Sequence, residues 1–218
     1  MMKGLVLWGL LGMSTVQAAD MIALRYVDQD PGDSPYLTRI LVTPDFMRMD
    51  GGEDAGDFVL LDRRQRKVFN VMRDSMLVMV FSPGALPAKP VNWKAQLITG
   101  KAERGTQRFS LAVKGVVCSE GIVARRAAPD VARALAELKS ILAATQYRVW
   151  QDSPRDLQHD CDLANQVWES GATLKLGLLL EEREYTGRTR QLESESKQPL
   201  QPELFRIPDG ITAINAPS

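Results

Sequence analysis

The chain has 218 residues, of which 44% are hydrophobic and 25% are charged, and these proportions indicate neither a disordered chain nor a membrane-helix bundle. Its 27 basic and 27 acidic side chains cancel, so nucleic-acid binding lacks its usual electrostatic basis. A chain of this length is long enough for one domain with its own core.

The N-terminus has the pattern of a signal peptide. Lys3 is followed by the apolar run Gly4–Met13, and Val16 and Ala18 suit the −3 and −1 positions of a cleavage site. The run is too short to span a bilayer, and no cysteine stands at the cleavage point to carry a lipid. We expect a cleaved signal peptide over residues 1–18 and one exported, periplasmic domain over residues 19–218. An uncleaved N-terminal anchor helix is the alternative.

The first half of the mature chain reads as strands. Ile22–Asp28 is expected to open a sheet, and Tyr36–Phe81 contains three or four short alternating segments separated by tight turns. Connections this short join antiparallel strands, so this stretch predicts an antiparallel meander. Val91–Ala102 and Gln107–Val117 form a further candidate hairpin, and Val116–Ala124 is a possible additional strand.

The period then changes to that of a helix. In Pro129–Gln146 apolar side chains recur three and four residues apart, which predicts a helix with one apolar stripe. The stripe consists of Val131, Leu135, Leu138 and Leu142. A second helix is expected to begin with Ser153 as its N-cap and Pro154 at its first position, and to end near Gly171. Its expected buried face consists of Leu157, Cys161, Ala164 and Trp168.

Strands resume after the second helix. Alternating leucines over 174–180 and the polar stretch Thr189–Lys197 are each expected to be a strand. In the last segment Leu204, Phe205 and Ile207 are expected to clamp onto the core. Strands, then two helices, then strands predict an α+β domain with the helices on one face of an antiparallel sheet.

Two cysteines, Cys118 and Cys161, remain after the signal. An even count in an exported chain predicts a disulfide, with two buried free thiols as the alternative. These cysteines and His159 cannot supply a closed tetrahedral shell, so no metal site is predicted.

Catalytic motifs and cofactor signatures are missing from the sequence. There is no G-x-S-x-G, H-E-x-x-H or phosphate-binding glycine loop. His159 reads as a solvated surface side chain, and Glu181 and Glu182 as exposed strand positions. The chain is therefore predicted not to be an enzyme and to need no cofactor.

The methionines are unevenly distributed. Of nine, three lie in the predicted signal, and five of the remaining six fall between residues 47 and 79. Methionine adapts to irregular apolar partners such as acyl chains, although ordinary core filling would also explain the cluster. The five are Met47, Met49, Met72, Met76 and Met79.

Several segments of the chain resemble a known superfamily. They are Pro44–Asp50, Phe58–Asp62, Lys67–Val71, Met76–Met79 and the closing Leu204–Gly210. Their order is similar to the motif progression of the periplasmic lipoprotein-carrier-like proteins, which include the LolA and LolB carriers and an uncharacterised exported branch. The resemblance implies a strongly curved antiparallel half-barrel whose concave face is covered by two helices, with an apolar cavity between them.

The resemblance also implies a function and a set of site residues. The expected function is non-enzymatic binding of a lipid or a lipoprotein acyl chain. The main alternative is an envelope interaction or scaffold protein with a filled core, and a hydrolase without a recognisable motif is a further alternative. In the carriers an arginine near the sheet influences lid closure, and Arg39 and Arg48 are the nearest matches here. The expected cavity residues are the five clustered methionines with Leu135, Leu138, Leu142 and Trp168. A monomer that contacts envelope proteins or the membrane surface, and no nucleic acid, is expected.

Overall fold

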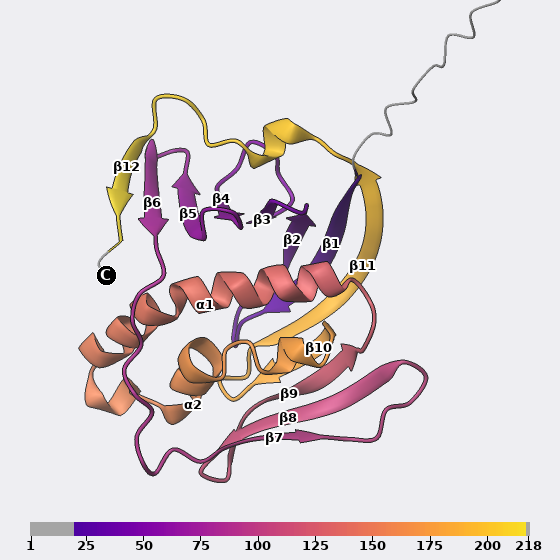
Figure 1. Ribbon diagram of the computed structural model, residues 1–218, viewed down its shortest axis with the longest axis vertical. Helices are drawn as coiled ribbons and strands as arrows, with labels where there is room; N and C mark the ends of the chain where they lie inside the picture. The colour runs from indigo at the N-terminus through magenta and orange to yellow at the C-terminus, as the bar shows by residue number, and fades with distance from the viewer. Residues whose placement is uncertain (1–19, 217–218) are drawn as a thin grey trace, which may run out of the picture.

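The computed structural model describes residues 20–216, so the predicted signal peptide lies outside the described part of the chain. The strands form one twelve-stranded sheet in the order β12-β6-β5-β4-β3-β2-β1-β11-β10-β9-β8-β7 (Figure 1). The strands before the helices are β1 (Asp20–Gln29), β2 (Tyr36–Val42), β3 (Phe46–Asp50), β4 (Phe58–Asp62), β5 (Lys67–Met72), β6 (Leu77–Phe81), β7 (Ala95–Thr99), β8 (Thr106–Val113) and β9 (Val116–Ala124). Those after the helices are β10 (Leu178–Glu184), β11 (Thr189–Pro199) and β12 (Thr212–Asn215).

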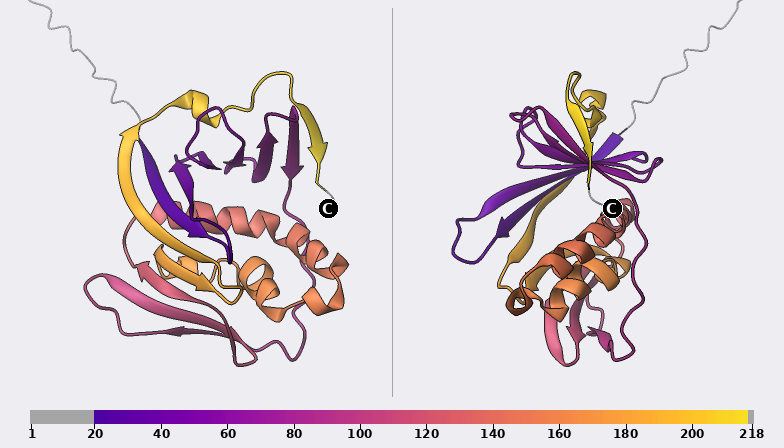
Figure 2. Two further views of the ribbon diagram at one scale, coloured as in Figure 1. Left: turned by 180° about the vertical axis from the view of Figure 1, so that it is seen from behind. Right: turned by 90° about the vertical axis from the view of Figure 1, so that its left-hand side faces the viewer.

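The α+β class and the antiparallel meander are confirmed. Strands β1 to β6 follow one another across the sheet, each antiparallel to its neighbour. The sheet is strongly curved and twisted, and the helices gather against one of its faces (Figure 2). One strand departs from the expected pattern, because β12 pairs with β6 in parallel. The segment after β11 crosses the meander before it pairs, so β12 arrives in the same direction as β6.

The first helix, α1 (Pro129–Asp152), lies across the concave face and is longer than expected. Proline stands at its first position and Asp130 in its first turn, which suits the free N–H groups there. Its buried face includes the predicted Val131, Leu135 and Leu138, whereas Leu142 is half-buried.

The expected start of the second helix is wrong. Ser153 ends α1, because its N–H bonds the carbonyl of Trp150 and its hydroxyl donates to the carbonyl of Val149. Pro154 follows and holds Ser153 extended, which prevents the helix from continuing. After a 3-10 turn over Arg155–Leu157, in which Leu157 is exposed, the chain forms α2 (Asp160–Asp162). A π-helix, η2 (Leu163–Trp168), continues α2.

The strand expected from residue 174 begins later. Thr173–Lys175 is a 3-10 turn, η3, and β10 begins at Leu178. Between them Gly177 has φ +150°, and a Cβ there would lie 2.3 Å from the carbonyl oxygen of Ala124. Only glycine allows so close a backbone approach, and this approach directs the chain into β10 beside β9.

The meander half of the sheet is covered on both faces. On the concave face, Leu24, Ile40 and Leu61 pack with α1. On the convex face, Leu41 and Leu60 belong to a second cluster that is covered by a short 3-10 helix, η4 (Pro202–Phe205). The expected clamping of the last segment is confirmed: Leu204 and Phe205 are buried and Ile207 packs against the same cluster. Within residues 20–216 no helix combines the length and apolar character needed to cross a membrane.

Candidate ligand-binding site

A cavity of about 200 Å³ lies between α1 and the concave face of the sheet. It lies where β10 and β11 diverge: the two strands pair only at three rows next to their turn, Glu181–Gln191 to Arg183–Thr189. Beyond these rows β10 pairs with β9 and β11 with β1. The sheet therefore opens at this point, and side chains from both halves meet beneath α1.

One wall of the cavity is apolar. Leu135 and Leu138 extend from α1, and Leu174 and Leu179 come from η3 and β10. From the meander half come the ring of Tyr26 on β1 and the side chain of Met49 on β3, which complete this wall. Tyr26 is fully buried, and its hydroxyl donates to the carbonyl of Leu179 at 2.8 Å. Burial raises the pKa of Tyr26, so its hydroxyl stays protonated.

The opposite wall carries charge. It consists of Lys139 from α1, Glu182 and Glu184 from β10, and Arg188 and Arg190 from the turn and start of β11. Residues two apart in a strand point to the same face, so Glu182 and Glu184 both point into the cavity. Arg188 and Arg190 are also two residues apart, and both line the cavity. The cavity is therefore amphipathic rather than simply apolar.

Arg190 is fixed by a buried ion pair with Asp28. Two guanidinium nitrogens of Arg190 donate to the two carboxylate oxygens at 2.6 and 2.7 Å, and the hydroxyl of Thr38 donates to the same carboxylate at 2.6 Å. Burial opposes ionisation of Asp28, but these hydrogen bonds outweigh it and hold its pKa below the ordinary value. The pair forms a rigid corner of the site.

The carboxylates of Glu182 and Glu184 are less well partnered. Among residues 20–216 neither side chain makes a hydrogen bond or an ion pair. Burial and the neighbouring Glu182 raise the pKa of Glu184, against the opposing effect of Lys139, Arg188 and Arg190. Both carboxylates therefore retain capacity to accept hydrogen bonds inside the cavity.

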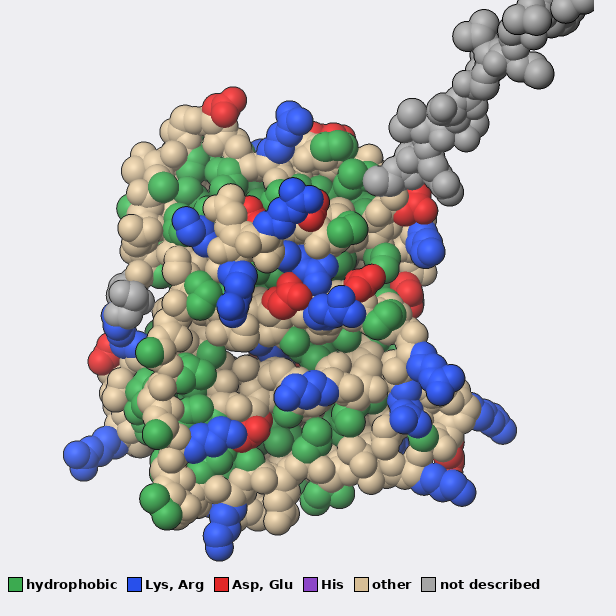
Figure 3. Space-filling view, viewed as in Figure 1, with side chains coloured by type: hydrophobic (Ala, Val, Ile, Leu, Met, Phe, Trp, Pro, Cys, Tyr) green, Lys and Arg blue, Asp and Glu red, His purple; other side chains and the backbone are tan. Residues whose placement is uncertain are grey.

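A shallower groove continues from the cavity along the concave face. It has a volume of about 390 Å³ and shares Met49, Arg188 and Arg190 with the cavity. Its floor continues over Val59, which pairs in register with Met49, and over Asn70, which pairs with Val59. On the face of the molecule drawn in Figure 3, charged side chains of both signs are interspersed with apolar ones.

The predicted methionines lie in different environments. Met49 lines both the cavity and the groove, whereas Met47 is fully buried in the core beneath α1. Val71 and Val78 belong to the convex cluster, so their neighbours Met72 and Met79 point to the concave face, where both are half-buried. Met76 is exposed in the turn before β6, away from the cavity lining.

The predicted helix residues are also divided. Leu135 and Leu138 line the cavity, and Leu142 packs against the core beneath α1. Trp168 does not line the cavity: its indole N–H donates to the carbonyl of Pro87, and its ring lies 4.5 Å from that of Trp93. Trp168 thus holds the β6–β7 connection against η2.

Arg39 and Arg48 lie on the convex face, opposite α1. Arg48 is buried; it donates to Asp50 and to the carbonyl of Leu204, and its guanidinium lies 4.1 Å from the centre of the Phe58 ring. Arg39 donates to both carboxylate oxygens of Asp50 at 2.8 Å. Arg48 thus fixes the C-terminal segment to the sheet, and among the described residues neither arginine makes a hydrogen bond or ion pair with α1, α2 or η2.

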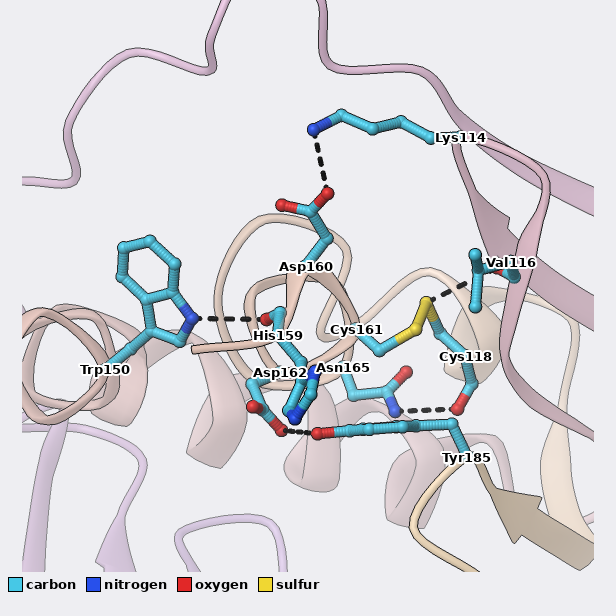
Figure 4. The surroundings of a disulfide bond; sticks show 10 residues. All are labelled: Lys114, Val116, Cys118, Trp150, His159, Asp160, Cys161, Asp162, Asn165 and Tyr185. Carbon is cyan, nitrogen blue, oxygen red and sulfur yellow. Dashed lines mark hydrogen bonds and ion pairs between the residues drawn. A yellow bond between two sulfur atoms is a disulfide. The ribbon is translucent and has the colours of Figure 1, made fainter. Parts of the chain in front are cut away.

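The predicted disulfide between Cys118 and Cys161 is confirmed (Figure 4). It joins β9 to α2, and both cysteines are buried. The side-chain amide of Asn165 donates to the carbonyl of Cys118, and the hydroxyl of Tyr185 donates to Asp162 beside Cys161. This cluster holds the second helical segment against the sheet and so fixes one end of the cover over the cavity.

The sequence alone did not reveal the charged wall. Glu182 was expected to be exposed but is half-buried in the cavity lining, whereas Glu181 on the other face of β10 is exposed. The alternation of Leu178–Glu184 was a signal for an inward row, but it did not show that this row would lie under a helix. Among the described residues no group of His, Cys, Asp and Glu side chains is arranged to hold a metal ion.

Neither a family model nor a curated protein matches the chain. Among solved structures, two crystal forms of PNGF-II align with 91% of this chain at 11% identity, with TM-scores of 0.36 and 0.37. The alignment spans only 31% and 32% of the PNGF-II chains, about a third of their length. The LolA superfamily protein NE2245 from Nitrosomonas europaea aligns over 88% of this chain and 91% of its own, at 9% identity and a TM-score of 0.32. Scores this low do not establish a shared fold, so the function has to be inferred from the site itself.

Proposed function

We propose that this protein binds an amphipathic or hydrophobic ligand, such as a lipid or a lipoprotein acyl chain, without transforming it. The observation that carries the proposal is the continuity of the cavity with the groove through Met49. The cavity alone, at about 200 Å³, is smaller than the ~300–1,000 Å³ usual for small-molecule sites. The groove of about 390 Å³ brings the combined space into that range.

The groove offers an acyl chain a suitable surface. Met49 and Val59 are half-buried there, and Met72 and Met79 extend the apolar concave face toward β6. Methionine side chains adapt to flexible apolar partners, and each buried CH₂ group of a ligand contributes about 0.8 kcal/mol.

The proposed location is the periplasm. The Cys118–Cys161 disulfide fits an oxidising compartment, where such bonds form and persist. A lipid-binding protein in this compartment would meet its ligand at a membrane surface or on a lipoprotein. The competing function, an envelope scaffold with a filled core, predicts that the protein takes up no ligand.

Native mass spectrometry of protein purified from its own envelope tests the proposal, together with displacement of a fluorescent fatty acid. We expect a co-purifying lipid mass and saturable displacement. Met49→Glu should weaken binding about tenfold or more, because it places a charge where cavity and groove meet. Ile98→Glu is the matched control, since Ile98 is exposed on the distant edge strand β7. A ligand-free protein that ignores the fatty acid would support the scaffold instead.

A further inference from the structure

The two unpartnered carboxylates of the site line the cavity, and the apolar side chains of Met49 and Val59 lie on the floor of the groove. Five charged side chains line the smaller cavity. The groove is also bordered by Asp50, Asp57, Arg188 and Arg190, but its floor continues over Met49 and Val59. None of these five side chains that line the cavity has a polar atom that is both buried and unpartnered among the described residues, so their free polar atoms face the open space of the cavity. The distribution suits a ligand whose polar head enters the cavity and whose chain lies in the groove.

Glu182 and Glu184 provide one half of the recognition chemistry. They occupy alternate positions of β10 and face the cavity, and among the described residues neither carboxylate has a hydrogen-bond or ion-pair partner. Two adjacent carboxylates repel each other, and a positively charged hydrogen-bond donor placed between them would relieve that repulsion. A primary ammonium group has this charge and three donors.

Arg188 provides the other half. Its side chain is 37% exposed, and its contacts are long: 3.8 Å to Asp28, 3.6 Å to Asp30 and a 3.5 Å hydrogen bond to the hydroxyl of Tyr36. Arg190 is instead held in place by its bidentate pair with Asp28. Arg188 borders both the cavity and the groove, so its guanidinium can turn to an anionic group at the junction. Lys139 adds a second cation, with its ammonium nitrogen held only by a 3.5 Å contact to the carbonyl of Asn165.

We propose that the cavity recognises a head group that carries both a primary ammonium and a phosphate, as in an aminophospholipid. The ammonium lies between Glu182 and Glu184, the phosphate faces Arg188 and Lys139, and the acyl chain follows the groove over Met49. The cavity volume of about 200 Å³ equals roughly six or seven water volumes, which suits a small head group and not a long chain. This inference rests on the proposed function but goes beyond it, because it names the head group and orients the ligand.

The test compares two lysophospholipids that share one acyl chain and differ in the head, one with phosphoethanolamine and one with phosphoglycerol. Binding is measured by isothermal titration below the micelle concentration. We expect the ethanolamine form to bind about tenfold more tightly to the wild-type chain. The double variant Glu182→Gln/Glu184→Gln should lose that preference and keep its affinity for the glycerol form. Arg188→Gln should weaken both forms, because both carry phosphate.

Glu181→Gln is the matched control, since Glu181 lies on the same strand but is exposed on the other face. Thermal melts of each variant show that it is folded. Equal binding of the two lysolipids, or equal weakening of both by the double variant, would overturn the head-group assignment and leave the binding function standing. Failure of both to bind would overturn both proposals. If free phosphoethanolamine binds as tightly as the lysolipid, the chain does not lie in the groove and the proposed orientation is wrong.

Discussion

The hydroxyl of Tyr26 donates to the carbonyl of Leu179 at 2.8 Å, which links β1 to β10 at the point where the sheet opens. In the sheet order β11 lies between these strands, yet this part of β10 does not pair with it. The carbonyl of Leu179 is thus satisfied by a side chain from the other half of the sheet. The contact closes the cavity floor and joins the two halves of the molecule.

Removing this contact should destabilise the fold. Tyr26→Phe leaves the buried carbonyl of Leu179 without its partner, and we expect a loss of about 1–3 kcal/mol in the free energy of unfolding. Urea denaturation measures it. Tyr36→Phe is the control, because the Tyr36 hydroxyl bonds Asp30 at an exposed site and its loss should cost less than about 0.5 kcal/mol. Equal losses in the two variants would contradict a bridging role for Tyr26.

The buried pair of Asp28 and Arg190 should dominate the stability of the charged wall. Asp28→Asn leaves Arg190 without its counter-charge, and a loss of about 3–5 kcal/mol is expected. Asp45→Asn breaks the exposed pair with Arg64 and should cost less than about 1 kcal/mol. Chemical denaturation at neutral pH compares the two variants.

The pair of Asp28 and Arg190 also predicts how the stability of the fold depends on acidic pH. The folded-state pKa of Asp28 is lowered from its ordinary 3.8, so the folded state holds the proton less tightly than the unfolded state. The stabilisation is fully present above pH ~4 and is lost as the pH falls through the folded-state pKa. Stability curves of wild type and Asp28→Asn should therefore converge as the pH falls below about 4. Curves that stay parallel down to pH 2 would show that the carboxylate does not contribute in this way.

The disulfide is expected to stabilise the fold. Cys118→Ser/Cys161→Ser is expected to lose about 2–4 kcal/mol, since the bond closes a long loop between residues 43 apart in sequence. A reductant in denaturant should bring the wild-type chain to the same midpoint, while the double variant should not respond to it. Alkylation with mass spectrometry before and after reduction counts the thiols. A wild-type chain with two alkylatable cysteines in its native compartment would contradict the pairing.

A substitution at Leu138 distinguishes two interpretations of α1, a cover above a cavity and part of an ordinary packed core. Its side chain borders the cavity, so Leu138→Ala removes contacts that are already incomplete and should cost less than the ~2–5 kcal/mol usual for a packed core. Leu61→Ala is the matched comparison, because Leu61 is fully buried and does not line the cavity. Thermal melts with and without a bound fatty acid should show a ligand-dependent shift only for the Leu138 variant. A full-sized loss without ligand dependence would favour the filled core.

Local periodicity predicted most of the elements. Strands with period two and a helix with apolar residues three and four apart specify which side chains share a face, and this information is contained in neighbouring residues. The meander, the stripe of α1 and the polar strand β11 were all predicted on this basis. The boundary at Ser153 was not, because the same serine and proline can begin one helix or end another. The hydroxyl of Ser153 donates to the carbonyl of Val149. Ser153 therefore ends α1, and this outcome depends on how far α1 extends.

The sequence by itself determined the fold class, the two cysteines that can pair and the apolar face of the main helix. Only the tertiary structure decided which faces meet. The cavity where β10 and β11 separate is lined by residues from distant parts of the chain: Tyr26, Lys139 and several residues between Glu182 and Arg190. Arg39 and Arg48 were expected near the lid, but the strand register places both on the convex face, where Arg48 bonds the C-terminal segment. Periodicity fixes the side on which a residue points, but the long-range pairing of strands fixes what covers that side.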